Sequence, residues 1–250
     1  FNKNKVKENN LSSIASLISN EVFKLTPIIH NELVVRDRLS SMSMNGAFNL
    51  LTRVFNNSHL KNLGMEGNPS EFGIYLSLIK SNNLHIKKSD EYVISIENTN
   101  NKSIKTIYDE FLKLIKGSKE AVNVSDIYAH FVKQPYGIKI GLLPILIGIF
   151  FKATEASCAF YNKDEQGRES LITEFDQKIA ERLYHMPETL KIMFVKIEGE
   201  KQIILDEFKS YVEKNFLNNR PIENATPLYV LKPIVVKAYK LPSYSRKTRN

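Results

Sequence analysis

Two acidic residues stand four positions before a histidine on segments with helical periodicity: Asp126 before His130, and Glu181 before His185. Residues at this spacing lie on the same face of a helix, so each pair could supply two ligands to a metal ion. Zinc normally takes at least three protein ligands, and the spacing provides no third. We therefore interpret both as solvent-side pairs that stabilise their helices, and we expect no metal or other cofactor.

The motifs of common enzymes are absent from the sequence. The nearest phrase to a phosphate-binding loop, Gly117-Ser118-Lys119, lacks the glycine that should precede it by five residues. The signatures of α/β-hydrolases and zinc proteases are also missing. Cys158 is the only cysteine and stands among apolar residues, so we expect a small buried side chain rather than a nucleophile.

Positive charge is concentrated at the C-terminal end. The chain of 250 residues has 35 Lys and Arg against 27 Asp and Glu, which gives a net charge of +8. Residues 224–250 contain no acidic residue and six cations, namely Lys232, Lys237, Lys240, Arg246, Lys247 and Arg249. A segment with one sign of charge favours an anionic partner, so we expect this segment to bind nucleic acid through its phosphates.

A second basic site is expected on a β-hairpin that carries Lys87 and Lys88, although Asp90 and Glu91 offset their charge. The alternative for this hairpin is an ordinary solvated surface.

No membrane partner is expected, because the longest apolar run, residues 140–151, falls short of the roughly 20 residues that span a bilayer. The single cysteine and the lack of a signal peptide predict a cytoplasmic chain, and Phe1 in place of Met suggests a piece of a longer protein.

The N-terminal part of the chain shows three helical segments and a hairpin. Apolar residues recur every three or four positions at 11–25, which Pro27 ends, and again at 44–55. Asn68 before Pro69 predicts the start of a third helix, with Asn68 as its cap. Alternation and β-branching then predict strands at 84–86 and 92–96 that join through Ser89-Asp90.

The same order of elements recurs after a polar linker at 98–103. The expected elements are helices at 104–115, 124–132 (capped by Ser125) and 140–151, followed by strands at 156–161 and 170–175. Beyond them we expect a helix that carries Ile179, Leu183 and Met186 and ends at Pro187, a strand at 190–197 and a helix at 203–216. Three helices and a hairpin, twice over, follow the element order of a winged helix.

We therefore predict an α-rich α+β fold. Tandem winged-helix-like modules would occupy residues 1–98 and 104–198, and a helical C-terminal segment with a basic tail would occupy 199–250. A three-helix bundle with an incidental hairpin is the alternative. The helix at 140–151 has no side chain that can donate a hydrogen bond to a base, so we expect it to be buried and its module to be a packing scaffold.

Several phrases are similar to one class of bacterial protein. They lie at residues 26–33, 36–40, 69–78, 134–139, 141–146 and 241–249. They resemble the segment downstream of the nucleotide-binding core in large bacterial P-loop (AAA-type) ATPases, some of which act in phage defence. In that family a Pro-aromatic-Gly phrase, here Pro135-Tyr136-Gly137, leads into the buried helix of a winged-helix module. Because the ATP-binding loop is absent here, the resemblance implies that ATP hydrolysis belongs to a parent protein.

The resemblance also implies that the polar cluster at 30–38 lies closest to the ATPase core. Arg36 and Arg38 are then candidate inter-domain contacts, and an ordinary exposed charge cluster is the alternative. The leading hypothesis is a non-catalytic DNA- or partner-binding winged-helix region of a larger bacterial ATPase. The alternatives are a stand-alone DNA-binding protein such as a plasmid replication initiator, and an enzyme of unrecognised family built from scattered residues.

Overall fold

The computed structural model describes residues 11–195, 200–218, 222 and 227–242. In the N-terminal part, α1 and α2 are followed by the short 3-10 turn η1, the single turn α3, the π-helical segment η2 and a hairpin. Their bounds are Leu11–Val22 (α1), Ser41–Asn56 (α2), Lys61–Gly64 (η1), Phe72–Ile74 (α3), Tyr75–Lys80 (η2), His85–Lys88 (β1) and Glu91–Ile94 (β2).

The middle of the chain alternates helices and strands, and two helices follow it. The bounds are Lys102–Gly117 (α4), Val122–Asn123 (β3), Val124–Val132 (α5), Leu143–Thr154 (α6), Glu155–Ser157 (η3), Cys158–Lys163 (β4), Glu169–Leu171 (β5), Gln177–His185 (α7), Pro187–Thr189 (η4), Leu190–Phe194 (β6), Glu200–Phe216 (α8) and Pro227–Lys240 (α9). Helices predominate and two small sheets accompany them, so the predicted α-rich α+β class is confirmed for the described residues.

Both sheets are antiparallel. β1 pairs with β2 so that Lys87 faces Tyr92 and the chain turns through Ser89, whose φ is 55°. The other sheet has four strands in the order β3-β6-β4-β5, and Phe160 of β4 lies opposite Ile192 of β6 in its centre. The predicted hairpin at 156–175 therefore forms, and the later strand β6 joins it between β3 and β4.

One hydrophobic cluster runs through the helices and strands from Ile29 to Ile192, and α6 passes through its middle. Every residue of 143–151 is buried, as predicted for this helix. The helices α2 and α6 approach so closely at Gly148 that a Cβ there would lie 2.4 Å from a Leu51 methyl carbon. The core is thus shared between the regions 1–98 and 104–198, whose division into two modules remains a prediction.

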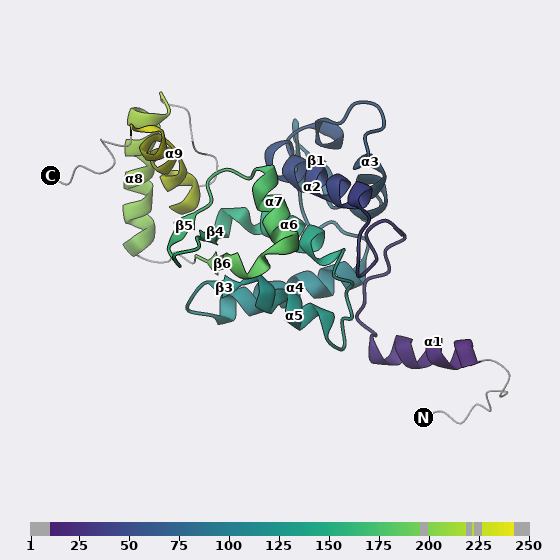
Figure 1. Cartoon of the computed structure of the whole chain (residues 1–250). Coiled ribbons are helices and arrows are strands. Elements are labelled where there is room, and N and C mark those ends of the chain that lie inside the picture. The colour runs from purple at the N-terminus through teal and green to yellow at the C-terminus, as the bar shows by residue number, and fades with distance from the viewer. Residues whose placement is uncertain (1–10, 196–199, 219–221, 223–226, 243–250) are drawn as a thin grey trace.

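The helices α8 and α9 have a small core of their own, made of Leu205, Val212, Ile222 and Val230. They lie side by side at one end of the molecule, and α1 lies at the opposite end (Figure 1). Several large apolar side chains on these terminal helices are exposed, namely Leu17 and Ile18 on α1 and Ile203, Ile204, Phe208 and Tyr211 on α8. No helix among the described residues has the length and apolarity needed to cross a bilayer.

Some predicted helix ends are wrong. The third helix begins at Phe72 rather than at Pro69, because Ser70 and Glu71 form a turn and the Glu71 carboxylate binds Arg53 instead of capping. Asn68 is therefore no cap. The predicted cap Ser125 lies inside α5, which follows Asn123.

Two further apolar residues lie outside the helices predicted for them. Ile140 precedes α6 and is 50% exposed, since the helix begins at Leu143 with Pro144 in its first turn. Met186 follows α7 and is also exposed, because that helix ends at His185. In both cases the apolar periodicity of the sequence continues beyond the residue at which the helix begins or ends.

Candidate functional site

A cleft of about 1000 Å³ is lined mainly by three separate parts of the chain, and Ser58, His59 and Tyr108 complete its lining. Residues 86–88 and 91–98, from the β1–β2 hairpin and the segment after it, form one side, and residues 152, 153, 155 and 156, at the end of α6 and in η3, form the second. Residues 217, 222, 232, 233 and 236 from the α8–α9 region form the third. The cleft is thus built by packing, because none of these segments could enclose a cavity alone.

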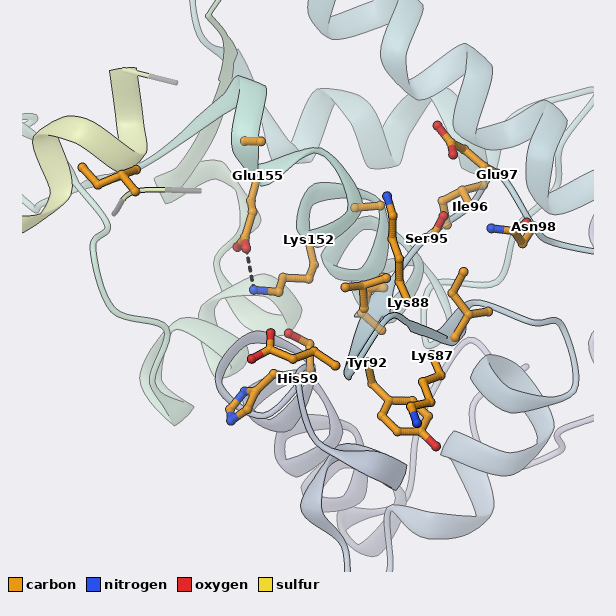
Figure 2. A pocket seen from close by; sticks show the side chains of 18 of the residues that line it. His59, Lys87, Lys88, Tyr92, Ser95, Ile96, Glu97, Asn98, Lys152 and Glu155 are labelled. Carbon is orange, nitrogen blue, oxygen red and sulfur yellow. Dashed lines mark hydrogen bonds and ion pairs between the residues drawn. The ribbon is translucent and has the colours of Figure 1, made fainter. Parts of the chain in front are cut away.

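The cleft brings together three cations that the sequence predicts as nucleic-acid contacts: Lys87 and Lys88 from β1, and Lys232 from α9. All three are exposed. In Figure 2 the Lys88 side chain extends into the cleft, whereas that of Lys87 lies beside the ring of Tyr92, its partner across the hairpin. This alternation follows from the strand, in which neighbouring side chains point to opposite faces.

The charges of the remaining lining residues determine what the cleft can bind. Lys152 at the end of α6 adds a fourth cation, and its Nζ lies 2.6 Å from Oε1 of Glu155 (Figure 2). Glu91 and Glu97 also line the cleft. Four lysines therefore face three glutamates, which leaves one net positive charge among the lining residues. Lys152 is paired with Glu155, and Glu91 lies opposite Lys88 across the hairpin.

His85 holds the hairpin in place. Its Nε2 lies 2.8 Å from the carbonyl oxygen of Ser58, and its Nδ1 lies 3.0 Å from the hydroxyl of Tyr75. A carbonyl can only accept, so Nε2 carries the proton and Nδ1 accepts from Tyr75. Burial lowers the pKa of His85, which favours this neutral form. No sequence pattern indicates this role, because an isolated histidine has no characteristic spacing.

The other predicted cations are dispersed. Lys237 lies 4.8 Å from the centre of the Phe216 ring, so it links α9 to α8 by a cation–π contact. Lys240 is exposed at the end of α9. The predicted cations Arg246, Lys247 and Arg249 lie outside the described residues.

Arg36 and Arg38, the candidate inter-domain contacts, lie on an exposed loop away from the lining of the cleft. Nη2 of Arg36 is 3.7 Å from the carboxylate of Glu32. The backbone of the same loop is well anchored, since the Gly141 N–H donates to the Arg36 carbonyl at 2.9 Å. A Cβ at Gly141 would lie 2.6 Å from that oxygen, so only glycine allows the loop to approach α6 this closely.

Neither predicted acid–histidine pair forms. His130 Nε2 lies 3.4 Å from Glu110 on α4, and Asp126 accepts from the Asn123 side chain. The ring of His185 packs edge-on against Phe48, because tertiary packing turns it away from the partner four residues before it. Within the described part of the chain, no three metal-binding side chains come together.

Cys158 is buried at the start of β4, as predicted. Burial raises the pKa of its thiol to about 11, so the neutral thiol predominates near pH 7. A buried, protonated thiol is a poor nucleophile, and its position in the core explains why the residue is small.

No family model matches this chain, and neither does any curated protein or solved structure.

Proposed function

We propose that the chain is a non-catalytic nucleic-acid-binding region whose helical body positions the cleft as the contact surface. The observation that carries this proposal is that Lys88 and Lys232, which lie far apart in the sequence, line one cleft together with Lys87, whose side chain lies beside Tyr92. Lysine ammonium groups bind phosphates as point charges and give affinity without base specificity. A neutral or apolar ligand would gain nothing from these three exposed cations.

The winged-helix interpretation fits the middle of the chain best. The order α4, β3, α5, α6, β4, β6, with β6 lying between β3 and β4, follows the helix and strand order of that fold, and β5 and α7 form an insertion before the last strand. The helix that would read the major groove, α6, is buried on all sides. We therefore assign this module the role of a scaffold and place nucleic-acid contact at the cleft.

The same proposal places the chain in a larger bacterial ATPase, some relatives of which would act in phage defence. It is supported by the phrase Pro135-Tyr136-Gly137, which turns the chain toward α6 through Gly137 at a φ of 57°. A Cβ at Gly137 would lie 2.5 Å from the ring of Phe23, so this turn requires glycine. Arg36 and Arg38 would face the rest of that protein.

The test is a titration of labelled DNA, followed by anisotropy over a series of salt concentrations. The triple variant Lys87→Ala, Lys88→Ala, Lys232→Ala should bind more weakly, and its plot of log affinity against log salt should be flatter by up to about 2.7 for duplex DNA. The matched control removes three exposed lysines outside the cleft, Lys119, Lys133 and Lys178, and should keep most of the slope. Equal losses in both variants would contradict the assignment of the cleft.

A further inference from the structure

Two helices at opposite ends of the molecule carry apolar stripes. The α1 stripe consists of the half-buried Ile14 and two exposed side chains, Leu17 (60% exposed) and Ile18 (56% exposed). The α8 stripe consists of four exposed side chains, namely Ile203, Ile204, Phe208 and Tyr211. We propose that the α1 stripe of one copy of this chain packs on the α8 stripe of a second copy. Such a contact joins different surfaces of the two copies, so it can continue from copy to copy, head to tail.

The helix α1 needs a neighbour to be stable. It has 12 residues, and an isolated helix shorter than about 12–15 residues is marginal in water even when it is rich in alanine. Four of the residues of α1 are serine, which has a lower helix propensity than alanine. Residues 15–21 are nevertheless all exposed, and α1 stands apart from the body of the molecule (Figure 1). Nothing in the described part of the chain buries Leu17 and Ile18, so we assign that role to another molecule.

The α8 stripe has the shape of a surface that a helix can cover. Ile204, Phe208 and Tyr211 fall within about 60° of one another around the helix axis, at 3.6 residues per turn. Leu205, which packs in the core between α8 and α9, lies on the adjacent face of α8. A third helix on the stripe would therefore lie next to the α8–α9 pair. The stripe is about 12 Å long and α1 about 18 Å, at 1.5 Å per residue, so α1 can cover all of it.

Charge favours the pairing of α1 with α8 over the pairing of two α1 helices. Residues 1–24 contain four lysines and two glutamates, which gives this segment a net charge of +2. Residues 200–216, which form α8, contain four acidic residues and three lysines, which gives a net charge of −1. Two copies of the N-terminal segment therefore repel each other, whereas the N-terminal segment and α8 attract. Because α1 and α8 lie at opposite ends of the molecule (Figure 1), the contact joins two copies of the chain.

The test is sedimentation of the full chain without nucleic acid, so its result is independent of the proposed function. A contact through one helix is smaller than the roughly 1,200 Å² of stable complexes, so association should be weak and need micromolar concentrations. The mean mass of the wild type should rise with concentration past that of a dimer. The α1 variant (Leu17→Gln, Ile18→Gln) and the α8 variant (Ile204→Gln, Phe208→Gln) change only exposed side chains, and each should self-associate at least about tenfold more weakly.

An equimolar mixture of the two variants is the decisive measurement. The α1 variant keeps an intact α8 stripe and the α8 variant keeps an intact α1 stripe, so the mixture can form a single contact and should give dimers and nothing larger. The control Ser19→Gln, Asn20→Gln, on the opposite face of α1, should associate like the wild type.

Three results would overturn the proposal. A wild type that stays monomeric would leave α1 to a different partner, and a mixture that stays monomeric would exclude the contact between α1 and α8. Self-association of either variant alone at the wild-type concentration would place the contact elsewhere, and dimers of the α8 variant would indicate pairing of two α1 helices.

Discussion

Lys152 Nζ lies 2.6 Å from Oε1 of Glu155 and also donates to the Phe55 carbonyl at 3.2 Å. This one ammonium therefore joins the end of α6 to the end of α2, at the wall of the cleft. Glu155 is within reach of Lys152 because it follows by three residues, about one helical turn. The Phe55 carbonyl is within reach because α2 and α6 pack closely against each other. The arrangement that could hold a strand thus depends on the same packing that forms the core.

The buried state of α6 gives a direct test of that core. Leu146 is fully buried, so Leu146→Asp would place an unpaired charge among apolar side chains and should destabilise the protein by several kcal/mol. The half-exposed Ile140 provides the matched control, and Ile140→Asp should change the free energy of unfolding by less than about 1 kcal/mol. Urea unfolding followed by circular dichroism measures both. Similar midpoints for the two variants would mean that α6 is exposed.

The ion pair between Arg53 and Glu71 should contribute more to the free energy of unfolding than an exposed ion pair does. The Glu71 side chain is only 3% exposed, and Arg53 Nε donates to its carboxylate at 2.8 Å. Arg53→Ala leaves that carboxylate short of a donor, which should cost about 1–3 kcal/mol of unfolding free energy. Arg36→Ala removes an exposed pair with Glu32 and should cost less than about 0.5 kcal/mol.

The loss of stability in Arg53→Ala should also depend on pH. Burial raises the pKa of Glu71, but its backbone hydrogen bond and Arg53 outweigh this effect and hold the pKa below its usual value. In the wild type, the contribution of the ionised Glu71 carboxylate to the free energy of unfolding is therefore fully present above about pH 4.5 and is lost as the pH falls through the lowered pKa. Without Arg53 the carboxyl is more easily protonated, so the difference between variant and wild type should narrow in acid. A constant difference would show that Arg53 acts through packing alone.

His85 should make the hairpin sensitive to mild acid. Because burial lowers its pKa in the folded state, the unfolded chain binds a proton more readily, with a pKa of about 6.5. The stability that this group contributes is present above that pH and is lost as the pH falls below it. His85→Gln should therefore show a weaker fall in unfolding midpoint between about pH 7 and about pH 5 than the wild type. An identical fall in both would exclude His85 as the titrating group.

The sequence predicts helices and hairpins well here and the site only in part. Periodicity identifies α8, for example, yet Ile203, Ile204, Phe208 and Tyr211 on it are exposed, because periodicity cannot tell which neighbour a helical face will meet. The charge pattern indicates the basic segments at 87–88 and 232–240. Their convergence on one cleft depends on contacts between distant segments, as do the roles of Lys152 and His85, and no local pattern encodes those contacts.

The basic C-terminal segment offers a final test of where phosphates are bound. Deletion of residues 243–250 removes Arg246, Lys247 and Arg249 but leaves the lysines of the cleft. If these three cations contact phosphates, the plot of log affinity against log salt should flatten by up to about 2.7 for duplex DNA and by about 2.1 for a single strand. The deletion combined with the triple lysine variant of the cleft should lower the slope by the sum of the two changes, since separate phosphate contacts release separate counterions. An unchanged slope after the deletion would exclude these three cations as phosphate contacts.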